Sequence, residues 1–193
     1  MQRFHERPRF PRGVVSVGLR PSPEPHLHPK APTREARIIL LAMLQAGAFG
    51  TILNERGEVL LCHRRDLDLW NPPGGRVEAG ESPWEAVVRE IREETRVEAA
   101  VVRLASVSWK PGRKEIVFQF VCRIVAGQLG PTDESDSFEY FPLDKLPEQL
   151  GTAFRRRLLK WSMHPDETAL ITDEGPSTRE LLEKGHFRRR RPV

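Results

Sequence analysis

The chain has 193 residues, of which 38% are hydrophobic and 30% are charged, and its formal net charge is +4. This length allows one globular domain with a substantial core and excludes two large domains with a linker. The longest apolar run, Ile38 to Leu44, is much shorter than the ~18 residues that suggest a membrane span, and it begins too far from Met1 for a signal peptide. We therefore expect no membrane partner.

The two cysteines, Cys62 and Cys122, lie in separate apolar stretches and form no C-x-x-C pair. This usage predicts neither a disulfide framework nor a zinc site, and it favours a reducing, cytoplasmic location. His63 and His164 also lack neighbours at metal-ligand spacing, so we assign them no role.

The positive charge is concentrated at the two ends of the chain. Residues 1–37 carry eight Lys or Arg and three acids, and the run from Arg188 to Arg191 adds four cations, so the ends together carry +9. The remaining body then carries −5, which is the opposite of a basic nucleic-acid-binding face and suits a cation site. We expect no specific nucleic-acid partner; such a role would show as salt-sensitive binding that disappears when both ends are removed.

Three regions follow from the distribution of proline and of apolar residues. Residues 1–37 hold seven of the 17 prolines and no sustained apolar period, so we predict a flexible leader. Residues 38–165 form the predicted domain, and residues 166–193 form a predicted tail with a basic end. Between Thr33 and Leu44 a helical turn and a strand are both compatible with the pattern, and a biological start at Met43 stays an alternative.

The domain begins with a predicted hairpin followed by a constrained loop. Apolar runs at Ala46–Leu53 and Val59–Cys62 flank the turn residues Asn54–Gly57. The segment Trp70–Gly75 contains two adjacent prolines, which remove two backbone donors, so it cannot be a central strand. Its glycines allow the backbone to approach a ligand closely.

A helix is predicted from Ser82 to about Thr95. Ser82 supplies an N-cap, Pro83 occupies the first helical position and Glu85 completes a capping box. The apolar residues at helical spacing predict a buried stripe of Trp84, Val87, Val88 and Ile91.

Further strands are predicted at 97–107 and 116–125, joined by the turn at 110–113, and a short strand at 138–141. A second helix from about Thr152 has Phe154, Leu158 and Trp161 at helical spacing. Strands combined with two packed helices predict a three-layer α/β arrangement.

Three carboxylates gather on one side of the first helix. Glu90, Glu93 and Glu94 stand at i, i+3 and i+4, so they share a face and repel one another. A solvated acidic face is the common explanation of such a group. A cation would also compensate the repulsion, and clustered carboxylate oxygens suit Mg²⁺ or Mn²⁺.

The surrounding sequence favours the cation. The segment from Gly75 to Thr95 resembles the Nudix box, G-x5-E-x7-R-E-U-x-E-E-x-G-U, in which U is aliphatic. Gly75–Glu81 matches the first part of the box and, after seven intervening residues, Arg89–Thr95 matches the second. The resemblance covers roughly residues 46–150 and fails at one fixed position, where Arg96 replaces a glycine. It implies a Nudix-like three-layer α/β/α sandwich with a mixed sheet. It also implies a metal-dependent hydrolase that cleaves a phosphoanhydride bond.

The resemblance assigns roles to individual residues of the box. It implies that Glu90, Glu93 and Glu94 bind divalent metals, Mg²⁺ or Mn²⁺, together with a backbone carbonyl at Gly74. Arg89 is expected to orient a glutamate. Arg96 stands just beyond the helix end, where a left-handed residue other than glycine costs ~1–2 kcal/mol, but it removes no metal ligand.

Residues around the box complete the expected site. We place Arg64, with Arg65 as the fallback, beside a substrate phosphate, and Gly75 and Glu81 on the substrate side of the site. A surface role is an equal alternative for either arginine. Glu134 resembles the loop acid that many family members use as a metal ligand or general base, although a loop acid is often merely solvated.

The expected reaction is in-line attack of a metal-activated water on a phosphorus of a nucleotide diphosphate. Glu134 or one of the box glutamates would act as the general base. Nucleoside diphosphates linked to another group and nucleoside triphosphates both stay open as substrates. A Nudix-fold nucleotide sensor without catalysis is the alternative, supported only by Arg96, and a homodimer stays open.

Overall fold

The computed structural model describes residues 44–176 and 178–190, so the predicted leader, residues 1–37, lies outside the described part. The helices and strands in chain order are β1 (Gln45–Ile52), β2 (Val59–Arg64), β3 (Trp70–Asn71), β4 (Gly74–Arg76), α2 (Pro83–Thr95), β5 (Val97–Lys110), a 3-10 turn (Pro111–Arg113), β6 (Glu115–Gly127), β7 (Ser135–Phe141), α3 (Thr152–Ser162), β8 (Ala169–Thr172) and α4 (Thr178–Glu183). None of the helices in this described part is long and apolar enough to cross a membrane.

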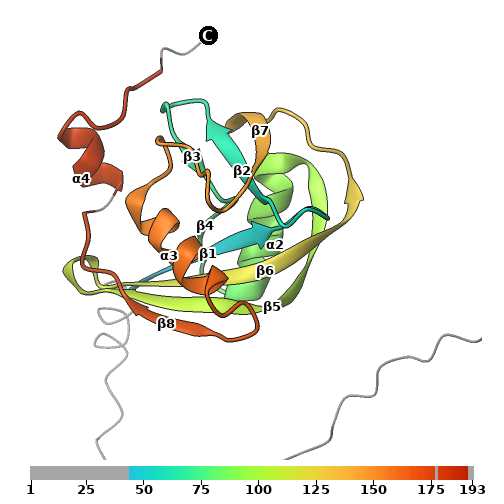
Figure 1. The fold of residues 1–193 in the computed structure, drawn as a ribbon, viewed down its shortest axis with the longest axis horizontal. Helices are drawn as coiled ribbons and strands as arrows, with labels where there is room; N and C mark the ends of the chain where they lie inside the picture. The colour runs from blue at the N-terminus through green and yellow to red at the C-terminus, as the bar shows by residue number, and fades with distance from the viewer. Residues whose placement is uncertain (1–43, 177, 191–193) are drawn as a thin grey trace, which may run out of the picture.

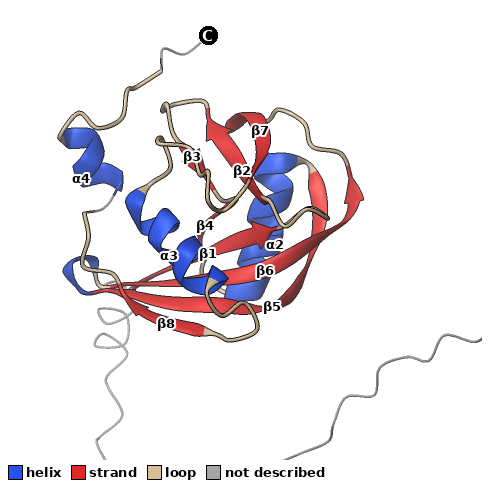
Figure 2. Cartoon of the chain, in the orientation of Figure 1, coloured by secondary structure: helices blue, strands red, loops and turns tan. Residues whose placement is uncertain are grey.

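The strands form two sheets (Figure 2). The larger sheet has the order β4-β1-β6-β5-β8, with β1 parallel to β6, β8 parallel to β5, and the other pairs antiparallel. The smaller sheet, β3-β2-β7, is antiparallel throughout. The predicted mixed sheet is therefore confirmed, whereas the smaller sheet was not predicted.

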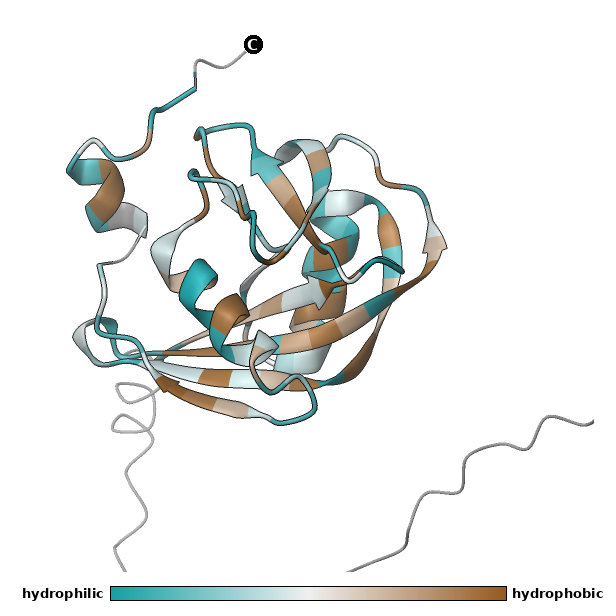
Figure 3. Ribbon diagram, in the orientation of Figure 1, coloured by the Kyte–Doolittle hydropathy of each residue, from teal (hydrophilic) through white to brown (hydrophobic). Residues whose placement is uncertain are grey.

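The helices α2 and α3 cover opposite faces of the larger sheet (Figure 1). Successive residues of β1 show this, because Ala48 joins the core under α2 whereas Phe49 packs edge-on against Phe154 of α3, with ring centroids 4.7 Å apart. Apolar positions along β5, β6 and α2 mark the core in Figure 3. The predicted three-layer arrangement is confirmed.

The predicted hairpin opens instead of pairing along its length. Its turn forms as expected, with the Gly57 amide donating to the Asn54 carbonyl at 3.0 Å. Beyond a single bridge between Leu53 and Val59, however, β1 enters the larger sheet and β2 enters the smaller one. The divergence buries both faces of β2, which explains its unbroken apolar sequence.

The predicted loop at 70–75 is shorter than expected. Trp70 and Asn71 pair with β2, and Gly74 to Arg76 pair with β1, so only Pro72 and Pro73 stand between two short edge strands. Prolines are tolerated there because the chain changes sheets at this point and needs no backbone N–H donor, and the Pro73 carbonyl still accepts the Gly50 amide at 2.8 Å.

The helix α2 has the predicted start. Ser82 is the N-cap and forms a capping box with Glu85, and Pro83 is the first helical residue. The prediction for Trp84 is wrong, because 59% of this side chain is exposed. The buried arc extends instead toward Ala86, which shares a flank of the helix with Glu90 and Glu94.

The segment after residue 165, which we predicted as a tail, adds to the folded body. β8 pairs in parallel with β5, and Asp173, directly beyond β8, binds Arg157 of α3 at 3.2 Å. The strand β8 was hard to predict from the sequence, because it has only four residues and its pairing partner β5 lies far away in the chain.

A buried polar layer lies between the larger sheet and α3. Its members are almost fully buried: Thr51, Ser106, Ser108, Gln119, Arg157 and Asp173. Gln119 donates to the Thr51 hydroxyl at 2.7 Å. Among the described residues, the hydroxyls of Ser106 and Ser108, Oε1 of Gln119 and Nε of Arg157 have no hydrogen-bond partner.

Arg96 ends α2 in the left-handed conformation, with φ 65° and ψ 9°. Its amide donates to the Arg92 carbonyl, so helix termination is preserved without glycine. Because a side chain costs energy in this conformation, Arg96→Gly is expected to stabilise the protein by about 1 kcal/mol. Urea unfolding checks this. Arg92→Gly, inside the helix, should instead destabilise by about 1 kcal/mol, and equal effects of the two changes would contradict the argument.

Candidate active site

The site is built where β4 passes between β1 and α2. Gly74 has a φ of 143°, and a Cβ on it would lie 2.3 Å from the Ala48 carbonyl oxygen of β1. A Cβ on Gly75 would lie 2.5 Å from Oε1 of Glu90 on α2. The two glycines therefore allow the backbone of β4 to contact both the neighbouring strand and the carboxylates.

Arg89 holds the carboxylates of this region together. Its guanidinium forms a bidentate pair with Glu81, at 2.8 and 3.1 Å, and its Nη1 donates to Glu90 at 3.0 Å and to Glu93 at 2.9 Å. Nη2 also donates to the Arg76 carbonyl at 3.1 Å. The pair with Arg89 lowers the pKa of Glu81, so this carboxylate is ionised and fixed.

Glu94 lies deeper than the other two box glutamates. One of its oxygens accepts the Gly74 amide at 3.0 Å. Burial raises the pKa of Glu94 to about 8, the negative charges of Glu90 and Glu134 act in the same direction, and the Gly74 amide and Arg64 oppose them. Burial likewise raises the pKa of Glu90. Three acids thus interact across α2 and the loop before β7.

This donor set fits a divalent cation by its chemistry. Among the described residues, Glu90, Glu93 and Glu94 each keep one oxygen without a hydrogen bond. The repulsion and burial that raise the pKa of Glu94 are relieved by a nearby cation. Among the described residues, no three acidic, histidine or cysteine side chains converge tightly enough to enclose an ion. Arg89 forms ion pairs with Glu90 and Glu93.

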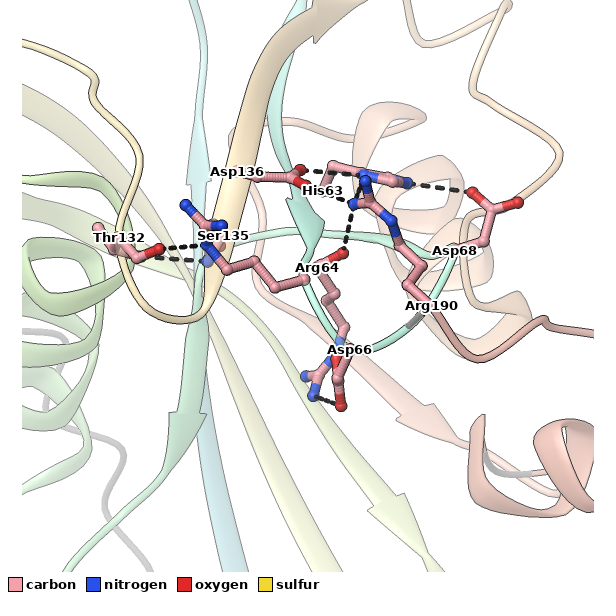
Figure 4. Close-up of polar contacts among 9 residues, drawn as sticks. His63, Arg64, Asp66, Asp68, Thr132, Ser135, Asp136 and Arg190 are labelled. Atoms are coloured by element: carbon pink, nitrogen blue, oxygen red, sulfur yellow. Dashed lines mark hydrogen bonds and ion pairs between the residues drawn. The ribbon is translucent and has the colours of Figure 1, made fainter. Parts of the chain in front are cut away.

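The two candidate arginines have different surroundings, and Figure 4 shows those of Arg64. Arg64 lines the cavity described below and makes a bidentate pair with Asp66, at 2.7 and 2.8 Å. Arg65 instead holds the loop of Glu134: its Nε donates to the Thr132 carbonyl at 2.6 Å and its amide donates to the Glu134 carbonyl at 2.9 Å. Arg64 is thus the better placed of the two for a ligand.

A cavity of about 430 Å³ opens beside β4, on the α3 side of the larger sheet. Gly74, Gly75 and Arg64 line one part of it, whereas Glu81 does not line it and stays with Arg89. Sequence reasoning missed the remaining lining residues, which include Phe49, Asn71, Lys110, Glu115, Phe154 and Arg157. The amide oxygen of Asn71 and Oε2 of Glu115 are buried and have no hydrogen-bond partner among the described residues.

Of the residues predicted for the site, the structure brings Gly74, Gly75, Glu90 and Glu94 into direct contact. Arg89 joins Glu81 and Glu93 to them, although 46% of the Glu93 side chain is exposed. Glu134 is exposed and acts on Glu90 and Glu94 through its charge. The buried polar residues that line the cavity could not be predicted from the sequence, because Asn71 and Lys110 appeared there only as parts of a loop and a turn.

Known proteins match this fold and site. The model of the NUDIX domain matches residues 43–162. The chain is 44% identical over 106 residues to the "Putative 8-oxo-dGTP diphosphatase" of Bacillus subtilis, covering 54% of this chain and 71% of that protein. It is 33% identical over 126 residues to the ADP-ribose pyrophosphatase of Methanocaldococcus jannaschii, covering 60% and 72% of the two chains.

Solved structures agree. The crystal structure of the MutT protein from Methanosarcina mazei Go1 has a TM-score of 0.55 and 25% identity, covering 64% of this chain and 96% of that one. A NUDIX hydrolase from Nitrosomonas europaea has a TM-score of 0.61 at 20% identity, covering 68% and 80%, and so supports the fold. The chain belongs to the NUDIX domain family.

Proposed function

We propose that the protein is a divalent-cation-dependent pyrophosphohydrolase that cleaves a phosphoanhydride bond in a small nucleotide. The observation that carries this proposal is the packing of Glu90 and Glu94 against the backbone of Gly75 and Gly74, two residues that also line the cavity. The charge of Glu134 acts on both carboxylates. Relatives named as a diphosphatase and as a pyrophosphatase support the reaction type.

Glu90, Glu93 and Glu94 would hold Mg²⁺ or Mn²⁺, with the Gly74 carbonyl as a further ligand. A bound cation there would neutralise phosphate charge and lower the pKa of a water molecule. Arg89 maintains the spacing of Glu90 and Glu93 by holding one oxygen of each. Glu134 reaches the same acids from an exposed loop and is available to accept a proton from water.

The cavity would bind the rest of the nucleotide. Arg64 would contact a phosphate, since its guanidinium lines the cavity together with Gly75. Phe49 and Phe154 offer aromatic surface, and the unpartnered Asn71 oxygen offers an acceptor for a ligand donor. The volume admits a nucleoside, so nucleoside triphosphates and linked nucleoside diphosphates are both candidate substrates.

A panel assay tests the proposal. Purified protein is incubated with 8-oxo-dGTP, dGTP, ADP-ribose and a nucleoside diphosphate sugar, with Mg²⁺, with Mn²⁺ or with excess chelator. We expect turnover of at least one compound, release of a nucleoside monophosphate, and loss of activity in chelator, because the carboxylates alone cannot neutralise phosphate charge. Turnover that persists in chelator would refute the metal requirement.

The alternative, a nucleotide sensor, predicts binding without turnover. Its sequence support, Arg96, lies at the helix end in a conformation that preserves termination, and every box glutamate is present. Binding of the panel compounds without product in either metal would favour the sensor.

A further inference from the structure

The end of the described chain lies as a short strand on the loop that follows β2. The Asp68 amide donates to the Arg188 carbonyl at 2.9 Å, and the Arg190 amide donates to the Asp66 carbonyl at 3.0 Å. An antiparallel bridge between Leu67 and Arg189 lies between these two bonds. Residues 188–190 are therefore attached to the loop that carries Asp66, the ion-pair partner of Arg64.

The side chain of Arg190 reaches across this loop (Figure 4). Its Nη1 lies 2.5 Å from Oδ2 of Asp136, 2.9 Å from Nδ1 of His63 and 3.1 Å from the Arg64 carbonyl oxygen. The guanidinium thus connects the last residues of β2 with the first residues of β7. The neighbouring residues Arg188 and Arg189 are exposed.

His63 links this contact to the loop. Its Nε2 lies 3.1 Å from Oδ1 of Asp68, and its Nδ1 lies 3.2 Å from Oδ1 of Asp136 and 2.9 Å from Nη1 of Arg190. The ring is only 14% exposed and packs on Trp70, with centroids 4.7 Å apart. The two N–H bonds of Arg190 Nη1 suffice for the Asp136 carboxylate and the Arg64 carbonyl oxygen, so Arg190 is a donor to Asp136 whichever ring nitrogen of His63 carries the proton.

The contact falls at an irregularity in the smaller sheet. His63 is opposite Ser137, whereas Arg64 is opposite Ser135, so Asp136 is an extra residue on β7. Such a bulge interrupts the ladder of hydrogen bonds and directs a side chain outward. Arg190 binds both sides of the interruption, at the Arg64 carbonyl and at the Asp136 carboxylate.

We infer that Arg190 is a positioning residue, which fixes Arg64 against the substrate phosphate and holds the start of β7 beside the loop of Glu134. The inference rests on the proposed function of Arg64 and extends it to the C-terminal basic run. Arg190 itself does not line the cavity, so it acts through Arg64 and Asp136.

Binding of α,β-methylene-ADP, which has no cleavable bridge between its phosphates, tests the inference without turnover. Its dissociation constant with Mg²⁺ is measured by calorimetry for the full chain, for Arg190→Gln and for the matched control Arg189→Gln. We expect Arg190→Gln to weaken binding about tenfold, because a displaced phosphate-binding group loses its alignment. Arg189→Gln should bind as the unmodified protein does.

A double-mutant cycle with Arg64 separates positioning from general loss of structure. In an Arg64→Gln background, Arg190→Gln should have no further effect, because the residue that it positions is already absent. Asp136→Asn should weaken binding as much as Arg190→Gln, which provides a second variant if Arg190→Gln folds poorly.

Unchanged binding in both Arg190→Gln and Asp136→Asn would overturn the inference. So would an equal weakening by Arg190→Gln with and without Arg64, since this would show an effect independent of Arg64. If no panel compound is hydrolysed but binding still depends on Arg190 through Arg64, the proposed function fails and the inference stands. If a panel compound is hydrolysed but binding does not depend on Arg190, the proposed function stands and the inference about Arg190 fails.

Discussion

Replacing Glu94 by Gln is expected to lower the rate of hydrolysis by about a hundredfold or more and, at the same time, to stabilise the metal-free protein in alkaline buffer. The loss of rate follows because Gln keeps the size and helix propensity of Glu but removes a charged cation ligand. Glu98→Gln, at an exposed carboxylate shortly after the same helix, is the control and should leave the rate unchanged.

The gain in stability follows from the raised pKa of Glu94, about 8 in the folded protein. An unfolded glutamate titrates near ~4.3, so between these two pH values the folded state binds more protons and its stability falls as the pH rises. Gln cannot ionise, so the stability of the Gln variant does not fall through this titration. The two proteins should therefore be equally stable below about pH 4 and should differ by about 3–5 kcal/mol above pH 8.

Urea unfolding at pH 4 and pH 9, in chelator, measures this difference. Added Mg²⁺ should stabilise the unmodified protein at pH 9 and have little effect on Glu94→Gln. A variant with full activity would show that Glu94 is no metal ligand. A stability difference that does not grow with pH would show that Glu94 is already ionised in the metal-free fold.

The second large effect is expected for Gly74→Ala, which should destabilise the protein by about 3 kcal/mol or more. Alanine at this position combines an unfavourable φ of 143° with a Cβ only 2.3 Å from the Ala48 carbonyl oxygen and 2.6 Å from Cα of Phe49. Since both obstacles are backbone atoms of β1, relief requires β4 to move away from β1, which would also disturb the contacts of Gly74 and Gly75 with the carboxylates of α2.

Two other glycines separate the cost of the positive φ from the cost of the contact with β1. Gly57 has a φ of 75° but open space around its Cβ position, so Gly57→Ala should cost only about 1–2 kcal/mol. Gly112 has open space and no positive φ, so Gly112→Ala should be nearly neutral. Urea unfolding of the three variants checks the order. If Gly74→Ala costs no more than Gly57→Ala, β4 and β1 do not approach as closely as described.

Local signals predicted α2 and its carboxylates well. Ser82, Pro83 and Glu85 define the start of the helix, and each acts within one turn, so no distant partner is needed. The spacing of the glutamates placed them on one face. Their partial burial could not be predicted, because it depends on Gly74 and Gly75 packing against Glu94 and Glu90.

Features that depend on distant pairing were less predictable. The divergence of β1 and β2 requires the partners β6 and β7, which follow much later in the chain. The ordered run at Arg188–Arg190 looked like a basic tail, because nothing in its own sequence indicates that Asp66 and Asp136 lie beside it. Trp84 shows the opposite error: helical spacing predicted burial, but this residue stays 59% exposed, beside Glu98 and Val101 of β5.

The polar layer under α3 has a consequence for motion. The α2 face of the larger sheet is covered by apolar side chains, whereas on the α3 face polar atoms of Ser106, Ser108 and Arg157 have no hydrogen-bond partner in the described part of the chain. Each such atom raises the energy of the closed packing, so the free energy for local opening is lower on this side. We therefore expect the wall of the cavity on the α3 side to open locally more readily than the α2 face that carries the carboxylates, a difference that amide hydrogen exchange would measure.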